Sequence, residues 1–343
     1  MKKILVTGSE GYIGTVMMPL LMESGFEVVG LDNCYYDEGN LNESEFLKYE
    51  LIKKDVRDVS IEDFKDKGYY GVVHLAALSN DPLGMLDEKL TYDINYKATV
   101  DIARLAKEAG VKRFVFASSC SLYGQGGNEA LSEEDPSNPQ TVYGKSKILA
   151  EEGLAKLADD DFSPTYMRNS TAFGFSPRMR FDIVVNSLSG YAKVDKEIKI
   201  LGDGKPWRPL VHVKDICRAV IHVLNSPKDL IHNQAFNVGD TEENYQIKSI
   251  AEHVKKYFND CEIKIAKDDA GDTRDYNVSF KKLNDELGFK IENTLDMGIE
   301  DLKNEYDKVD LNEQFEHRYY TRLKQIQHLL DEGIVDNDLR RIK

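Results

Sequence analysis

Short apolar runs alternate with amphipathic stretches through the first half of the chain. Short runs bounded by polar residues predict buried strands, and apolar residues that recur every three or four positions predict helices. The predicted strands are Ile4–Val6, Glu27–Leu31, Leu51–Lys54, Gly71–Leu75, Arg113–Ala117 and Thr165–Arg168. The predicted helices are Tyr12–Glu23, Asn95–Ala109 and Tyr143–Leu157. This order predicts an α/β fold built on a doubly wound parallel sheet.

The second half of the chain is less regular. The segment 175–204 shows no strong alternation of apolar and polar residues. Further on, the pattern predicts a strand at Arg208–Val213, a helix at Val213–Leu224 and a strand at Gln234–Val238 that returns to the main sheet. The remaining predicted helices are Leu283–Leu287, Met297–Tyr306 and a highly charged C-terminal tail.

Three glycines separate the first predicted strand from the first predicted helix. Gly8, Gly11 and Gly14 stand at a spacing of three. A glycine turn here lets the backbone approach a pyrophosphate, and the helix N-terminus then offers free N–H groups and the positive end of its dipole. The pattern is typical of dinucleotide binding because it lies between a strand and a helix.

Asp32 ends the second predicted strand, 18 residues after Gly14. An acidic residue near this distance holds the adenosine ribose hydroxyls. Its charge also repels a 2′-phosphate, so the sequence predicts NAD(H) rather than NADP(H) as the cofactor. The alternative is an ordinary aspartate in a surface turn.

The composition limits the possible partners. A net charge of −15 without a long basic cluster argues against a nucleic acid or an anionic membrane, although local arginines can still bind a small anion. The seven histidines and four cysteines show no zinc-site spacing and no disulfide framework, so we expect no metal and a reducing cytoplasm. No apolar stretch approaches the ~20 residues of a membrane span, and the first one is too short for a signal peptide.

A Tyr-x-x-x-Lys motif and a Ser-Ser pair connect the chain to a known family. The motif begins at Tyr49, Tyr143 and Tyr320, but only Tyr143 opens a helix after the fifth strand, 24 residues beyond Ser119. The chain resembles the extended short-chain dehydrogenase/reductases, specifically the nucleotide-sugar epimerases and dehydratases such as UDP-glucose 4-epimerase. The matching residues are Thr7-Gly8-x-x-Gly11-x-x-Gly14, Asp32, Asp55-x-x-Asp58, His74-Leu-Ala-Ala77, Asn95, Ser118-Ser119, Tyr123-Gly124, Tyr143-x-x-x-Lys147, Arg168, Arg208-Pro-Leu-Val-His212 and Arg274.

The resemblance implies the domain organisation and the assembly. Residues 1–168 would form an NAD-binding Rossmann domain with a returning segment near 208–240. Residues 169–343 would form a smaller mixed α/β domain that binds the sugar nucleotide and ends in the charged helical tail. The active site would lie between them. The resemblance also implies a homodimer that pairs the helices Asn95–Ala109 and Tyr143–Leu157; burial of these helices within one subunit is the alternative.

The chemistry explains the spacing of the catalytic residues. Residues four apart share one helix face, so Lys147 is expected to bring its ammonium near the Tyr143 hydroxyl. A nearby cation favours the phenolate and lowers the tyrosine pKa from about 10 toward neutrality, which gives a general base. Ser119 is expected to hydrogen-bond the same substrate oxygen.

The resemblance also assigns ligand contacts. The residues implied for the cofactor are Gly8, Gly11, Tyr12, Ile13, Gly14, Asp32, Asn33, Asp55, Val56, Leu75, Ala76, Ala77, Asn95, Tyr143 and Lys147. Those implied for the substrate are Ser79, Ser119, Ser121, Thr171, Asn186, Arg208 and Arg274. Guanidinium groups bind phosphate in two-pronged fashion, which suits Arg208 and Arg274. A surface role and a ligand role stay equally open for Arg178 and Arg180. His74 and His212 are expected to be structural.

The expected activity is NAD-dependent epimerisation of a nucleotide sugar through a transient 4-keto intermediate. Dehydrating relatives place Asp-Glu directly after the catalytic Ser or Thr, and here these positions hold Cys120 and Ser121, which are poor acids at neutral pH. The alternatives are an NAD(H)-dependent 4-keto-sugar reductase, a dehydratase that uses a carboxylate from elsewhere, and a non-catalytic sensor. Thr171 stands where galactose epimerases usually carry Asn, so the sugar stays open, as does the nucleotide base.

Overall fold

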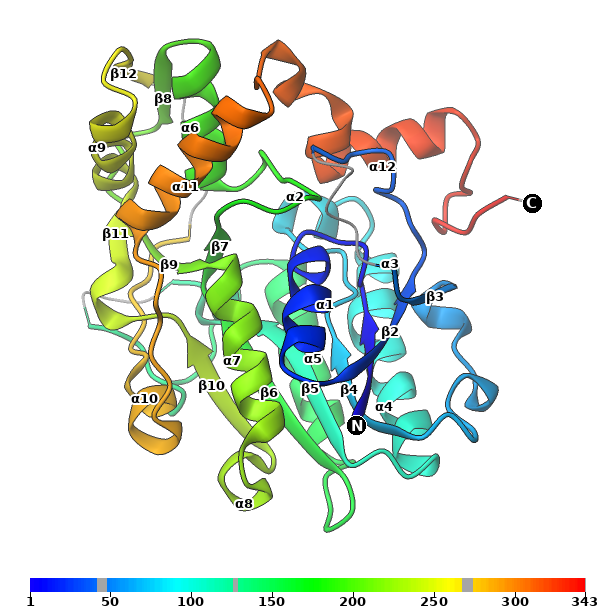
Figure 1. Ribbon diagram of the computed structural model, residues 1–343. Coiled ribbons are helices and arrows are strands. Elements are labelled where there is room, and N and C mark those ends of the chain that lie inside the picture. The colour runs from blue at the N-terminus through cyan, green and yellow to red at the C-terminus, as the bar shows by residue number, and fades with distance from the viewer. Residues whose placement is uncertain (42–47, 126–128, 267–273, 343) are drawn as a thin grey trace.

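Seven parallel strands form the central sheet of the computed structural model, which describes residues 1–41, 48–125, 129–266 and 274–342 (Figure 1). In spatial order the strands are β10 (Gln234–Val238), β6 (Ser163–Asn169), β5 (Arg113–Ser119), β4 (Tyr69–His74), β1 (Lys3–Thr7), β2 (Glu27–Asp32) and β3 (Glu50–Lys53). The predicted parallel sheet is confirmed. Its strand order reverses between β4 and β1, which is where sheets of this kind bind their ligands.

The side chains of alternate residues of β1 pack on opposite faces of the sheet. Ile4 and Val6 are fully buried in one core cluster with α1 (Gly14–Glu23) and α7 (Val213–Asn225). Leu5 points the other way, into a second cluster. Among the helices that contribute to that second cluster are α4 (Ala98–Glu108) and α5 (Val142–Ala155). Figure 1 shows these helices on both sides of the strands.

The helix expected at Asn95–Ala109 differs at its start. It begins as α3 (Glu88–Tyr92), continues through a π-helical turn at Asp93–Lys97 and becomes α4 only at Ala98. Asn95 lies in the π turn, where its amide accepts from the Leu78 backbone N–H at 2.8 Å and donates to the Leu78 carbonyl at 3.1 Å. Periodicity could not show this turn because the pairing with Leu78 is tertiary.

Two smaller sheets belong to the second half. The three-stranded sheet has the order β11 (Asn244–Gln246), β9 (Trp207–His212) and β7 (Thr171–Phe173), and β12 (Glu262–Ala266) pairs with β8 (Glu197–Leu201). Of the segment 208–240, β9 joins this three-stranded sheet and β10 joins the central sheet. The segment 175–204, where the pattern predicted nothing regular, contains α6 (Val184–Val194) and β8.

The remaining helices lie mostly in the C-terminal half. They are α2 (Asp81–Gly84), α8 (Lys228–Ile231), α9 (Ile247–Tyr257), α10 (Lys281–Leu287), α11 (Leu295–Lys308) and α12 (Arg322–Asp331), with 3-10 turns between several of them. After α11 the chain turns back, so that α12 lies beside the segment that follows β2 (Figure 1). Within the described ranges, no helix is both long enough and apolar enough to span a bilayer.

Candidate active site and cofactor site

The backbone of the glycine turn after β1 lies directly against the backbone of the segment after β4. Gly8 has a φ of +73°, and a Cβ on it would lie 2.8 Å from the Ala76 nitrogen. A Cβ on Gly14 would lie 2.2 Å from the Gly8 carbonyl oxygen. The N-cap of α1 is Ile13, which makes no side-chain cap, so this helix end keeps N–H groups for an anion. The turn therefore fits a dinucleotide pyrophosphate.

Asp32 lies at the end of β2, beside this turn. Its carboxylate accepts the Glu10 N–H at 3.0 Å and the Cys34 N–H at 2.7 Å. Burial raises its pKa to about 6, against the lowering effect of these two hydrogen bonds. The remaining lone pairs of the carboxylate suit the two ribose hydroxyls that the sequence assigned to it.

Glu10 and Arg178 form a buried ion pair that the sequence did not reveal. Arg178 Nη2 lies 3.1 Å from Glu10 Oε2, and the side chains are 3% and 13% exposed. The Tyr49 hydroxyl donates to the other Glu10 oxygen. Arg178 therefore anchors the segment before α6 to the glycine turn. Removing one partner of such a pair typically costs about 3–5 kcal/mol.

The three catalytic candidates converge at the ends of β5 and α5. Ser119 closes β5, and Tyr143 stands in the first turn of α5, which Thr141 caps. The Ser119 hydroxyl hydrogen-bonds Tyr143 and so lowers its pKa. Lys147 Nζ lies 5.5 Å from the centre of the Tyr143 ring and donates to the Ala117 carbonyl at 2.7 Å. The structure thus brings together the three residues that the sequence grouped.

The expected lowering of the Tyr143 pKa is not found. Burial and the negative charge of Asp81 raise the pKa of Tyr143 to about 12. Burial likewise lowers the pKa of Lys147 to about 7, although the Glu151 carboxylate opposes this change. In this structure the Lys147 Nζ donates to the Ala117 carbonyl of β5 and lies over the Phe116 ring, 4.7 Å from its centre.

Asp81 is a site residue that the sequence analysis missed. It opens α2 close to Tyr143, because a Cβ on Gly84 of α2 would lie 3.2 Å from the Tyr143 Cβ. Its carboxylate is ion-paired with Arg274 Nη1 at 2.6 Å. Arg274 was expected to hold the diphosphate, and in this structure it reaches across to the N-terminal half. The only sequence signal for Asp81 was a charged residue soon after the His-Leu-Ala-Ala segment.

The arginines of the C-terminal half gather near these groups. Arg208 is buried and donates to the Arg274 carbonyl at 2.5 Å, so the two expected diphosphate ligands are adjacent. Arg180 pairs with Asp182 at 2.8 Å and donates to the Ser79 hydroxyl at 3.3 Å. Arg180 and Arg274 both lower the pKa of Tyr143.

The other expected substrate residues divide into two kinds. Ser121 is buried, and its hydroxyl has no hydrogen-bond partner among the described residues, so it can serve a ligand. Thr171 is half-buried in β7. Asn186 is fully buried; its amide accepts the Gly174 N–H at 3.0 Å and donates to the Arg180 carbonyl at 3.0 Å. Asn186 therefore holds the loop before α6, and its hydrogen-bonding groups are engaged inside the protein.

The remaining cofactor candidates follow strands β1 to β4 or lie in the π turn. Tyr12 turns its side chain inward and donates to the Gly174 carbonyl at 2.7 Å, so only its backbone is left to the turn. Asp55 is ion-paired with Arg57 at 2.6 Å, and Val56 is buried beside it. The others lie where their elements place them: Asn33 after β2, Leu75, Ala76 and Ala77 after β4, and Asn95 in the π turn.

The histidines expected to be structural are buried. His74 bridges the hydroxyls of Thr7 and Thr99 at 2.8 and 2.9 Å, and burial lowers its pKa to about 3. His212 caps α7, and its pKa falls to about 4 for the same reason. Across residues 1–41, 48–125, 129–266 and 274–342, no three His, Cys, Asp or Glu side chains are placed to hold a metal ion.

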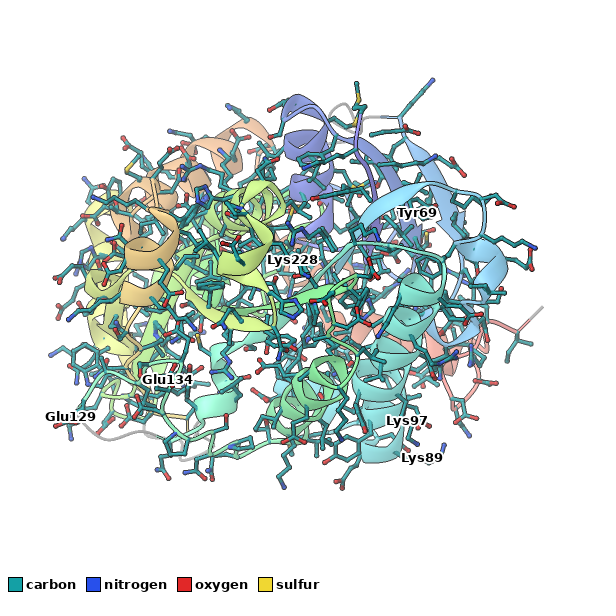
Figure 2. The ribbon with its side chains drawn as sticks, turned by 90° about the horizontal axis from the view of Figure 1, so that it is seen from below. Tyr69, Lys89, Lys97, Glu129, Glu134 and Lys228 are labelled. Carbon is teal, nitrogen blue, oxygen red and sulfur yellow. The ribbon has the colours of Figure 1, made fainter. Side chains whose placement is uncertain are left out.

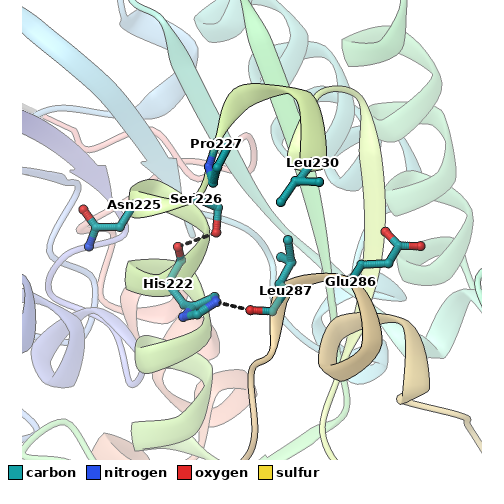
Figure 3. A pocket seen from close by; sticks show the side chains of 7 residues that line it. All are labelled: His222, Asn225, Ser226, Pro227, Leu230, Glu286 and Leu287. Atoms are coloured by element: carbon teal, nitrogen blue, oxygen red, sulfur yellow. Dashed lines mark hydrogen bonds between the residues drawn. The ribbon is translucent and has the colours of Figure 1, made fainter.

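A cavity of about 300 Å³ lies away from these residues. It is lined by residues of α7, α8 and α10, among them His222, Leu230 and Leu287 (Figure 3). His222 Nε2 is hydrogen-bonded to the Leu287 carbonyl at 2.7 Å, which fixes the ring against α10. None of the expected site residues lines this cavity, so the catalytic candidates and the cavity are separate features.

The fold and the glycine turn define a dinucleotide-dependent enzyme, and the Ser-Tyr-Lys set narrows the class further. The chain belongs to the NAD-dependent epimerase/dehydratase family, whose model matches residues 4–239. It is 26% identical to the UDP-glucose 4-epimerase of Corynebacterium glutamicum over 309 residues, which cover 85% of this chain and 92% of that protein. NAD is the cofactor of the family.

Solved structures agree with this assignment. MoeE5 in complex with UDP-glucose and NAD superposes with a TM-score of 0.77 at 25% identity, covering 89% of this chain and 99% of that one. The UDP-glucuronic acid 4-epimerase of Bacillus cereus, in complex with UDP-glucuronic acid and NAD, has a TM-score of 0.77 at 25% identity, covering 90% and 99%. The resemblance stated from the sequence is confirmed at the level of the family.

The elevated pKa of Asp32 leads to a prediction about cofactor binding. Because ribose hydroxyls donate to the carboxylate, NAD affinity should fall as the pH falls through about 6, by up to about tenfold per pH unit. Titration calorimetry of the cofactor-free protein between pH 8 and 5 measures this. Lys147 also gains a proton in this range. Asp32→Asn isolates the contribution of Asp32: it should flatten the acid limb and weaken discrimination against NADP. A wild-type affinity that is the same at pH 7.5 and 5 would contradict the assignment.

Proposed function

We propose that this protein is an NAD-dependent nucleotide-sugar epimerase that oxidises one carbinol carbon of a hexose, C4, and reduces it again from the other face. UDP-hexoses are the leading substrate class, since the relatives compared above act on or bind UDP-sugars. The observation that carries the proposal is the convergence of Ser119, Tyr143 and Lys147 in a chain whose glycine turn fits a dinucleotide, with Cys120 and Ser121 in place of an acidic pair.

The residues of the chain have separable roles in this proposal. NAD, when bound, would supply the hydride-transfer chemistry at the carbinol carbon. Tyr143 takes the hydroxyl proton and later gives it back, and Ser119 hydrogen-bonds the same oxygen. Lys147 binds the nicotinamide ribose, while Arg208 and Arg274 grip the diphosphate. Removal of substrate and site from water strengthens each of these contacts.

Dehydration is the second candidate, and Asp81 is the observation that favours it. Elimination of water needs a positioned acid, whose help is typically worth about 10²–10⁴-fold. Cys120 cannot supply it, because burial raises the thiol pKa well above its usual range. Asp81 is a carboxyl group beside Tyr143, but in this structure it is engaged in an ion pair with Arg274. Epimerisation therefore ranks first.

A panel of nucleotide sugars tests the proposed function. We expect the purified protein, without added cofactor, to convert a UDP-hexose into an isomer of unchanged mass, followed by NMR of the anomeric protons and by mass spectrometry. The comparison set is the GDP-, dTDP- and CDP-sugars. Loss of one water would establish dehydration instead, and a strict requirement for added NADH would identify a reductase.

Substitution of Tyr143 tests the assignment of the base. Tyr143→Phe should lower kcat by at least about 10²–10⁴-fold and leave nucleotide-sugar binding nearly unchanged, because only the proton-transferring hydroxyl is removed. Tyr257→Phe on α9 is the matched control and should behave as the wild type. Near-normal kcat in Tyr143→Phe would remove Tyr143 from the mechanism.

We also propose a homodimer through the face formed by α3, the π turn and α5. A groove of about 540 Å³ lies there, floored by Tyr92, Tyr96 and Leu149. Lys89 and Lys97 stand close together at its rim, where both pair with Asp93 (Figure 2). Apolar side chains in a groove with a charged rim are typical of an interface between subunits.

Light scattering tests this assembly. The wild type should be a dimer, and Leu149→Asp should shift it to the monomer because a carboxylate would be buried at the interface. The matched control is Leu230→Asp, at an exposed leucine of α8. A wild-type mass that stays monomeric at every concentration would refute the dimer.

A further inference from the structure

The last 25 described residues, 318–342, form a strap across the N-terminal half of the chain. Figure 1 shows α12 and the residues after it beside the segment that follows β2. Four strap residues are buried in the same core cluster as Leu31 at the end of β2 and Val56 after β3. These strap residues are Ile326, Leu329, Val335 and Leu339. The strap is therefore packed onto the loops at the carboxyl ends of β2 and β3.

Arg341 of the strap is hydrogen-bonded to the turn at Asn33 and Cys34, and the same turn is hydrogen-bonded to Asp32. Its Nε donates to the Asn33 carbonyl at 3.1 Å, and its Nη2 donates to the Cys34 carbonyl at 2.7 Å. Cys34 has a φ of +58°, a left-handed conformation that a non-glycine residue adopts at a cost. The N–H of this residue donates to the Asp32 carboxylate at 2.7 Å. A continuous path thus joins Arg341 to Asp32 through one strained turn.

Arg340 makes the corresponding contacts with the loop after β3. Its Nη1 lies 2.6 Å from Asp58 Oδ2 and 3.5 Å from Asp55 Oδ1. Arg57, which grips the Asp55 carboxylate with two nitrogens, also donates to the Asp338 carbonyl at 2.7 Å. Two successive strap arginines therefore contact two successive loops, and each loop carries one acidic cofactor candidate.

A third contact fixes the strap between these loops. The Tyr35 hydroxyl donates to the Leu339 carbonyl, and the Gln325 amide donates to the Tyr35 carbonyl at 2.9 Å. Tyr35 itself is 5% exposed. Since Leu339 directly precedes Arg340, this contact sets the position from which both guanidinium groups reach the loops.

We propose that Arg341 and Arg340 are positioning residues of the cofactor site, through which the C-terminal strap sets the discrimination of NAD from NADP. Arg341 fixes the direction in which Asp32 presents its carboxylate to the ribose, and Arg340 does the same for Asp55. This inference rests on the assignment of Asp32 and Asp55 to the adenosine end of the cofactor. If the two arginines only held the strap in place, they would contribute to stability but not to the choice between NAD and NADP. This difference makes the inference testable.

The test compares cofactor binding by the full-length wild type and by Arg341→Ala, both stripped of cofactor, with calorimetry of NAD and NADP and a thermal melt. Arg341 is exposed, so its loss creates no cavity. We expect the Kd for NAD to rise about five- to tenfold, while the Kd for NADP changes less. The ratio of the Kd for NADP to the Kd for NAD therefore falls. Arg341→Lys should restore part of the ratio, because one ammonium can still donate to these carbonyls.

Two further variants keep the result decisive. Lys324→Ala removes a charge from the same strap, where the lysine donates to the Glu316 carbonyl, and should leave the ratio unchanged. A chain that ends at Leu339 lacks both arginines but keeps the buried strap residues, and it should lower the ratio at least as much as Arg341→Ala. A lower melting temperature with an unchanged ratio in both the Arg341→Ala and truncated chains would overturn the inference. A wild type that binds NADP as tightly as NAD would instead overturn the role of Asp32.

Discussion

The close approach of two backbones at the switch point of the sheet is the constraint on which the rest depends. Gly8 and Gly14 leave no room for a Cβ, because the Ala76 nitrogen and the Gly8 carbonyl lie 2.8 and 2.2 Å from the positions it would take. The same contact brings the segment after β4 to the glycine turn. That segment leads to α2, which packs against Tyr143, so a short stretch of chain links the close approach at β1 to the proposed catalytic tyrosine.

Charged pairs connect the two halves of the chain around this point. Glu10 pairs with Arg178, and Asp81 pairs with Arg274, in each case a carboxylate of the first half with a guanidinium of the second. Buried ions need such partners, because the loss of water costs several kcal/mol per ion. The pairs thus specify how the second half sits on the first. The second pair also contributes to the electrostatic potential at Tyr143, where Asp81 raises the tyrosine pKa and Arg274 lowers it.

The opposite pKa shifts of Tyr143 and Lys147 have one common cause. Burial disfavours whichever form is charged, so it raises the pKa of the phenol to about 12 and lowers the pKa of the amine to about 7. Helix spacing brings the two side chains to the same face but does not decide their charge state.

The sequence by itself determined the features that local chemistry encodes. The strands of the central sheet, the order of its α/β elements, the glycine turn and Asp32 follow from periodicity and from steric rules that act over a few residues. What depends on distant contacts was decided by the tertiary structure. The π turn forms around the pairing of Asn95 with Leu78, and α6 lies where no periodicity was visible. Asp81 and Arg178 each form an ion pair with a residue more than 150 positions away, so their roles could not be predicted from local sequence. The C-terminal strap contacts the turn at Asp32 across some 300 residues. Sequence patterns report spacing along one element, whereas burial and ion pairing depend on which elements the folded core brings together.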